Sequence, residues 1–174
     1  GFPAFAVGKE TLATQTRDSI LTKLGGNFGC KRFLLDGHQT VVEESSRIYY
    51  EQTELGKFEN IESEWPLFFT YLYISALFDG SEATAKHYRK KLEALMVHEN
   101  GIGLLPELYY VAKENIDAEK KNPRSQPRLP DPAKLVPPMF KCVMAADKGP
   151  EGERKLSVKV DSIKAEGDAA CIVI

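Results

Sequence analysis

The chain has 174 residues, of which 43% are hydrophobic and 28% charged, with a formal net charge of −2. This composition is typical of one globular domain, and the weakly acidic balance argues against a nucleic-acid partner. No apolar run reaches the roughly 20 residues of a membrane-spanning helix. The three cysteines have no metal-binding spacing, and their odd number argues against a disulfide framework. We therefore expect a reducing, cytoplasmic setting.

The first predicted element is a helix over residues 11–24, where leucine and isoleucine residues share a broad stripe. A glycine-rich stretch, residues 25–29, follows it. This stretch lacks the lysine and the serine or threonine that end a phosphate-binding loop. It is therefore predicted to be a helix stop and a turn. Residues 38–64, which come next, are polar, irregular and acidic.

Two helices joined by a tight turn are the clearest prediction. Residues 66–78 are apolar around the whole circumference, which predicts a buried inner helix that begins at Pro66. An Asp-Gly pair ends it, and Ser81 is the expected cap of a second, amphipathic helix over residues 82–97. An inner helix followed by an outer amphipathic helix is the unit of a helical toroid or solenoid.

The remainder of the chain is predicted to contain little helix. Residues 100–103 form a turn, and residues 104–111 are apolar and extended. Residues 113–138 hold many charges and six of the ten prolines, so they are predicted to be a loop or linker rather than a packed element. The tail that follows is polar, and we expect it to be poorly ordered apart from a weak strand pattern over residues 156–163.

An acidic cluster before the predicted inner helix is the main candidate for chemistry. The cluster contains Glu51, Glu54, Glu59, Glu62 and Glu64, and the only tryptophan, Trp65, follows it. Glycoside hydrolysis needs two carboxyl groups that flank the scissile bond, and an indole ring can stack on a sugar. Glu59, Glu62 and Glu64 are therefore candidate catalytic acids, although none is assigned, and Trp65 is a candidate carbohydrate-stacking residue. The alternative is that these acids favour the positive end of the helix dipole, as acids at helix starts commonly do.

The other polar motifs are weaker candidates for a functional site. His38, His87 and His98 are too scattered for a metal site, and we expect neither a metal nor a cofactor. Cys30 is expected to be a small core residue rather than a nucleophile. The basic, proline-containing run of residues 120–128 favours a solvated loop over a docking segment.

The last four residues, Cys171-Ile172-Val173-Ile174, fit a C-terminal prenylation box, with two aliphatic residues after the cysteine. Cys171 is therefore a candidate lipidation site. A prenyl group there would bring the protein to the surface of the plasma membrane. One lipid alone binds a membrane only marginally, and no strong basic patch adjoins it.

A series of motifs carries a family resemblance. In chain order they are Gly29-Cys30-Lys31-Arg32-Phe33-Leu34, Asp36-Gly37, Arg47-Ile48-Tyr49-Tyr50-Glu51, Phe58-Glu59-Asn60-Ile61-Glu62, Glu64-Trp65-Pro66, and Asn100-Gly101-Ile102 with Pro106-Glu107-Leu108-Tyr109. Over residues 1–135 they resemble the large regulatory subunits of phosphorylase kinase, and the α subunit more than the β subunit.

The resemblance implies both a fold and a function. The N-terminal region of these subunits is similar to glucoamylase-type glycoside hydrolases. The implied fold is all-α, a partial (α/α) toroid of helical hairpins over residues 1–135 with a divergent, largely disordered tail over residues 136–174. The implied function is regulation of the kinase in glycogen breakdown, without catalysis by this subunit. A glucoamylase-like carbohydrate-binding or hydrolase domain is the alternative.

The resemblance also implies partners. These are the kinase catalytic subunit, calmodulin and the other regulatory subunit, and the family's C-terminal prenylation agrees with the motif at Cys171. The chain departs from the family pattern at Leu35, where arginine is usual, and this puts a charged contact there in doubt. Beyond about Leu135 the similarity stops, although a toroid needs about six helix pairs. We therefore interpret the chain as a piece or an alternative form of a longer protein, whose inner helix would expose apolar surface.

Overall fold

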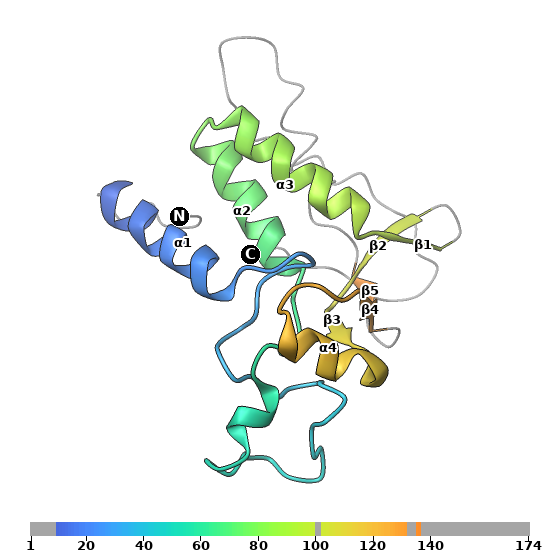
Figure 1. Cartoon of the computed structure of the whole chain (residues 1–174). Helices are drawn as coiled ribbons and strands as arrows, with labels where there is room; N and C mark the ends of the chain where they lie inside the picture. The colour runs from blue at the N-terminus through green and yellow to red at the C-terminus, as the bar shows by residue number, and fades with distance from the viewer. Residues whose placement is uncertain (1–9, 100–101, 132–134, 137–174) are drawn as a thin grey trace. The chain divides into compact units, whose positions relative to one another are not determined.

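The computed structural model describes residues 10–99, 102–131 and 135–136 (Figure 1). The chain divides into one unit of residues 1–138 and another of residues 139–174, and all described residues lie in the first. The strand pattern predicted in the tail and the candidate lipidation site Cys171 lie outside the described residues.

The first three helices are where the sequence predicts them (Figure 1). Helix α1 covers Glu10–Leu24 and ends where the backbone N–H of Gly25 donates to the carbonyl of Leu21 (3.1 Å). Helix α2 covers Leu67–Phe78, helix α3 covers Glu82–Ala94, and the two pack against each other. The helix stop and the αα-hairpin are therefore confirmed.

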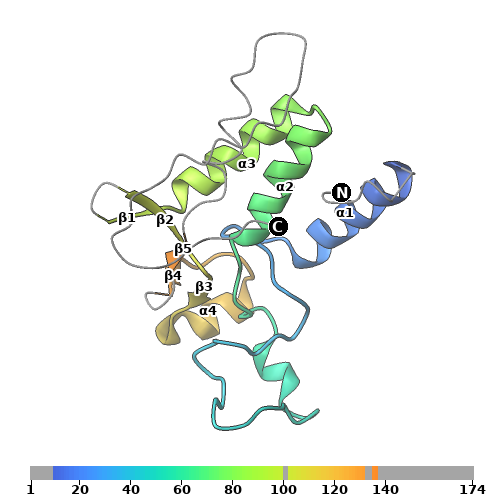
Figure 2. The same cartoon turned by 180° about the vertical axis from the view of Figure 1, so that it is seen from behind.

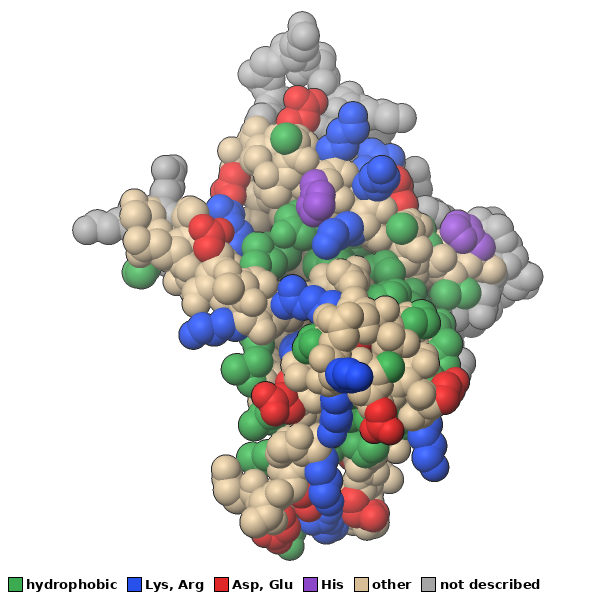
Figure 3. All heavy atoms as spheres, in the orientation of Figure 1, with side chains coloured by type: hydrophobic (Ala, Val, Ile, Leu, Met, Phe, Trp, Pro, Cys, Tyr) green, Lys and Arg blue, Asp and Glu red, His purple; other side chains and the backbone are tan. Residues whose placement is uncertain are grey.

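Helix α2 is less completely buried than its sequence predicts. Phe69 and Tyr73 are each 1% exposed and belong to the core, but Leu67, Tyr71 and Phe78 are 40%, 42% and 53% exposed. Figure 3 shows hydrophobic side chains open to view over this helix. The prediction of burial all round is thus wrong for one face, because an apolar sequence permits burial but the neighbouring elements decide it.

Helix α3 begins at Glu82, as predicted, but its C-terminal end and its cap bond differ from prediction. It ends at Ala94, because Val97–Glu99 forms strand β1 and pairs antiparallel with strand β2, Ile102–Pro106. Ser81 occupies the predicted cap position, but its hydroxyl donates to the hydroxyl of Thr84 (2.8 Å) and makes no backbone cap bond. The cap prediction is right in position and wrong in its hydrogen bond.

Short antiparallel strands correct the all-α fold class. Strand β2 also pairs with β5, Leu135–Val136. Strand β3, Tyr109–Val111, pairs with β4, Arg128–Pro130, with Tyr110 opposite Leu129. The extended segment predicted after the hairpin is confirmed, and the fold is helical with small sheets.

The segment predicted to be a loop or linker, residues 113–138, is packed over its described residues 113–131. It contains the 3-10 helix η2, Lys113–Asn115, the α-helix α4, Ile116–Lys121, and strand β4. Glu119 is 0% exposed and Arg128 is 5% exposed. The linker prediction is wrong because two charged residues that pair with each other can be buried, and hydropathy does not reveal such a pair.

Within the first unit, the irregular segment before α2 and the α2–α3 hairpin lie at opposite ends, as Figures 1 and 2 both show. The one helical turn of the irregular segment is η1, Leu55–Phe58. The ring of Phe58 is 1% exposed and packs against Tyr50, with 5.0 Å between ring centroids. A Cβ atom on Gly37 would come within 2.5 Å of the Phe58 ring, so only glycine fits there.

Candidate functional site

Backbone hydrogen bonds position the end of the acidic cluster between two other segments. Glu64 and Tyr109 exchange backbone hydrogen bonds of 2.9 and 2.8 Å, which join this segment to strand β3. Trp65 and Cys30 exchange bonds of 2.9 and 3.3 Å, which join it to the loop after α1. Side chains from three parts of the chain therefore meet around Glu64.

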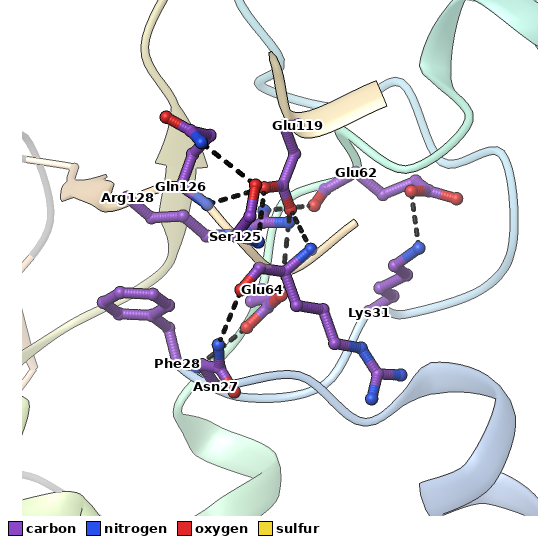
Figure 4. A network of polar contacts seen from close by, with 10 residues as sticks. Asn27, Phe28, Lys31, Glu62, Glu64, Glu119, Ser125, Gln126 and Arg128 are labelled. Carbon is purple, nitrogen blue, oxygen red and sulfur yellow. Dashed lines mark hydrogen bonds and ion pairs between the residues drawn. The ribbon is translucent and has the colours of Figure 1, made fainter. Parts of the chain in front are cut away.

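Arg128 is the centre of a buried polar cluster (Figure 4). Its Nη2 atom lies 3.2 Å from Glu64 Oε1 and 3.4 Å from Glu119 Oε1. Its Nη1 atom donates to the backbone carbonyl of Glu62 (2.6 Å). The Arg128 and Glu64 side chains are each 2% exposed and that of Glu119 is 0% exposed, so two carboxylates share one cation away from water.

Backbone N–H groups donate further hydrogen bonds to these two carboxylates. Glu64 Oε2 accepts a hydrogen bond from the N–H of Phe28 (2.8 Å). Glu119 accepts from three consecutive N–H groups in the loop after α4. These belong to Arg124 (2.8 Å), Ser125 (3.1 Å) and Gln126 (2.9 Å). The cluster thus ties the loop after α1, the segment before α2 and the loop after α4 together.

Glu62 forms a neighbouring buried ion pair. One carboxylate oxygen lies 2.6 Å from Lys31 Nζ, and the other accepts the backbone N–H of Leu35 (3.0 Å). Leu35 has a φ of 62°, a left-handed conformation that is unusual for leucine. The contact of Leu35 with Glu62 is therefore made by its backbone N–H.

The Trp65 indole lies among polar residues at the edge of this region. Arg32 donates to both carboxylate oxygens of Asp36 (2.6 and 2.8 Å), and this pairing raises the pKa of the guanidinium. The Arg32 guanidinium carbon lies 5.0 Å from the centroid of the Trp65 ring, within cation–π range. The His38 ring stacks on the indole with centroids 6.1 Å apart. The proposed sugar-stacking residue is thus in contact with two side chains of its own chain.

The structure does not bring the five predicted acids into one cleft. Glu62 and Glu64 are each 1% exposed and join the buried clusters, while Glu54 pairs with an arginine seven residues earlier. Glu51 and Glu59 are exposed. The oxygens of Glu62 and Glu64 are bonded to donors of the protein, as expected of structural ion pairs. Catalytic roles for Glu59, Glu62 and Glu64 stay predictions.

The sequence reasoning missed the cations and one acid. Lys31 and Arg128 neutralise the predicted acids, and Glu119 shares Arg128 with Glu64. Lys31 is adjacent to Arg32, and this basic pair was the one feature of the sequence that could have suggested a cation as a partner of the acids. Glu119 and Arg128 lie in the segment that was predicted to be a loop or linker, and nothing in their spacing indicates burial.

Cys30 is a buried free cysteine beside the cluster, as predicted for a core residue. Burial raises the pKa of its thiol to about 11, and the negative charge of Glu64 adds to this effect. Lys91 acts in the opposite direction. The thiol is therefore protonated at neutral pH and is a poor nucleophile.

The described residues also show whether the chain contains a metal-binding cluster or a membrane-spanning helix. Within residues 10–99, 102–131 and 135–136, no three side chains of the metal-binding types are grouped to hold an ion. In the same part of the chain, none of the helices has both the length and the apolar character to cross a bilayer.

Known proteins are similar to this chain over most of its length. Residues 4–148 match the model of glycosyl hydrolases family 15. Over 130 residues the chain is 48% identical to the phosphorylase b kinase regulatory subunit alpha, skeletal muscle isoform, of Oryctolagus cuniculus, and 44% identical to the probable alpha subunit of Caenorhabditis elegans. These alignments cover 74% of this chain and 10% and 11% of the relatives. The chain thus spans about a tenth of the length of those relatives.

Proposed function

We propose that this chain, which belongs to glycosyl hydrolases family 15, is part of a regulatory subunit of phosphorylase kinase and does not itself hydrolyse sugars. The observation that carries the proposal is the use of Glu62 and Glu64 as buried ion-pair partners. These are the acids that precede the inner helix, and they are occupied in holding segments of the fold together. The names of the relatives supply the regulatory role.

The geometry around Arg128 supports the loss of hydrolase chemistry. A glycoside hydrolase keeps its two carboxyl groups about 5–5.5 Å or about 6.5–9.5 Å apart, with the scissile bond between them. Here Glu64 and Glu119 share the guanidinium of Arg128. Both acids are also almost fully buried, so neither carboxylate is exposed to a substrate in solution.

The proposed partners follow from the same assignment. They are the kinase catalytic subunit, calmodulin and the other regulatory subunit, acting together in the control of glycogen breakdown. We propose a family-like region at residues 1–135 and a divergent tail after it, whereas the match to the model of glycosyl hydrolases family 15 extends to residue 148. We further propose a cytoplasmic protein that reaches the membrane surface through a prenyl group on Cys171.

Affinity capture tests this proposal. The 174-residue chain carrying an N-terminal tag is co-expressed with the kinase catalytic subunit and calmodulin, and captured proteins are identified by mass spectrometry. We expect the catalytic subunit to co-purify in near-stoichiometric amount, and we expect Arg128→Met to reduce this because it destabilises the segments that the buried cluster holds together. Arg89→Met, which alters an exposed ion pair, is the matched control and should retain the partner. Absence of the catalytic subunit from a folded, captured chain would contradict the proposal.

The alternative, a glucoamylase-like carbohydrate-binding or hydrolase domain, rests on family membership and on Trp65. Its test is binding and cleavage of maltotetraose by the same purified chain. Glucose release that is abolished by Glu59→Gln, Glu62→Gln or Glu64→Gln, without loss of the folded state, would favour it over the regulatory role. We expect no release.

A further inference from the structure

The irregular segment before α2 contains a loop that exposes its apolar side chains. We call residues 41–51 the acidic loop. Val41 and Val42 are 41% and 39% exposed, and Ile48 and Tyr49 are 101% and 60% exposed. Single exposed apolar residues are common on protein surfaces, but several on one short loop mark an interaction surface.

Polar contacts hold the acidic loop in shape. The hydroxyl of Tyr50 donates to Glu43 Oε1 (2.5 Å), which brings the two apolar stretches of the loop together. Arg47 Nη2 donates to both carboxylate oxygens of Glu54 (2.9 Å each), which ties the loop to the turn that follows it. The exposed apolar side chains are therefore pre-arranged, and this lowers the entropy that a binding partner must overcome.

The exposed charge of the acidic loop is negative. Residues 41–51 contain three glutamates, one arginine and no lysine. The arginine is bound to Glu54, whereas Glu44 and Glu51 are exposed. Hydrogen bonds from Ser46 lower the pKa of Glu44, so this carboxylate is ionised at neutral pH. A surface that is both apolar and negative fits a partner surface that is apolar and positive.

The α2–α3 hairpin carries a surface of that kind. Residues 86–91 of α3 contain four Lys and Arg, and the two acids of this helix lie outside the run. Lys86 and Lys90 are exposed. On α2, Leu67 and Tyr71 are 40% and 42% exposed, and their spacing of four residues places them on one face. Figure 3 shows Lys and Arg side chains over α3 and hydrophobic side chains over α2.

We propose that the chain binds a second copy of itself, with the acidic loop of one copy docked on the α2–α3 hairpin of the next. The two surfaces lie at opposite ends of the first unit, so they cannot meet within one copy (Figures 1 and 2). The carboxylates of the loop meet the lysines of α3, and the apolar side chains pack together. Such a heterologous contact leaves one free surface at each end, so association continues beyond the dimer. This inference does not depend on the proposed function.

Sedimentation velocity of the 174-residue chain tests the proposal. The chain is measured at concentrations up to about 200 μM, which reaches the micromolar affinities of weak interfaces. Each concentration is measured in about 50 mM and in about 500 mM sodium chloride, because salt screens exposed charges. We expect a sedimentation coefficient that rises with concentration, and rises less in high salt. A monomer at every concentration, or association that high salt does not weaken, would overturn the proposal.

Two charge-reversal variants identify the surfaces. The loop variant carries Glu44→Lys with Glu51→Lys, and the hairpin variant carries Lys86→Glu with Lys90→Glu. All four positions are exposed, so both variants should keep the circular dichroism spectrum of the unmodified chain. Each variant alone should associate at least tenfold more weakly, because like charges then face each other. An equimolar mixture should associate again, because opposite charges then face each other. A variant that associates as tightly as the unmodified chain, or a mixture that does not associate, would contradict the proposed contact.

Matched controls make the same changes in net charge at exposed positions outside the two surfaces. Glu114→Lys with Asp117→Lys is the control for the loop variant, and Lys23→Glu with Lys113→Glu is the control for the hairpin variant. Both controls should associate as the unmodified chain does. If the controls lose association as fully as the variants, net charge rather than the two surfaces governs it, and the proposal is overturned.

Discussion

Arg128→Met removes the cation at the centre of the buried cluster. Its guanidinium lies 3.2 Å from Glu64, 3.4 Å from Glu119 and 2.6 Å from the carbonyl of Glu62. Removing one partner of a buried ion pair costs about 3–5 kcal/mol. Glu119 retains three backbone donors and Glu64 retains one, so we expect a loss near the lower end, about 3 kcal/mol. That is a large part of the total stability of about 5–15 kcal/mol that is typical of a domain.

Urea unfolding followed by circular dichroism measures this loss at pH 7.5. In the variant, two buried carboxylates have lost their shared cation, which leaves uncompensated buried charge. Adding Glu119→Gln to the variant removes one of these charges and should therefore restore part of the stability.

The matched control is Arg89→Met, the same substitution in an exposed ion pair with Glu93 (2.9 Å). Exposed pairs at this helical spacing contribute about 0.3–0.5 kcal/mol, so its effect should be small. A loss below about 1 kcal/mol for Arg128→Met would refute the reasoning that the cluster holds the fold.

Two further predictions concern the same cluster. A Cβ on Gly26 would lie 2.1 Å from Glu64 Cδ, so Gly26→Ala should lower the free energy of unfolding, measured in urea, by about 1–3 kcal/mol. Its control, Gly56→Ala, would have no atom within 4 Å of the new Cβ and should be neutral or slightly stabilising. Equal effects of the two substitutions would contradict the contact. The Cys30 thiol, with its pKa raised from 9.0 to about 11, should react roughly 100-fold more slowly with Ellman's reagent at pH 8 in the folded chain than in urea. Because the unfolded thiol ionises first, the protonated thiol's contribution to stability is present below pH 9 and is lost as the pH rises from about 9 to about 11. Peptide mapping of Cys30 checks the rate, and reaction at the unfolded rate would contradict its burial.

The helices could be predicted because their signals are local. The apolar run of α2, the Asp-Gly stop and the amphipathic pattern of α3 each lie within a few residues of the feature they predict. The same local reasoning failed for the exposed face of α2, since burial depends on which other segments cover a helix. It also extended α3 into β1, because Val97 fits either a helix face or a strand.

The candidate site could be predicted only in part. The acids of residues 62–64 were found because they stand together before a helix, and they do belong to a buried site. Arg128 lies 64 residues beyond Glu64, among prolines and other charges, and no periodicity marks it. Pairing between distant charges is a tertiary event, so a single sequence carries no local trace of it.

The effect of this chain on kinase activity tests the central claim most directly. The initial rate at which the kinase catalytic subunit phosphorylates phosphorylase b is measured with increasing amounts of the 174-residue chain, with Arg128→Met and Arg89→Met as paired variants. The account predicts a saturable change in rate that Arg89→Met retains and Arg128→Met loses. An unchanged rate with a folded chain, together with release of glucose from maltotetraose, would contradict it and indicate a hydrolase.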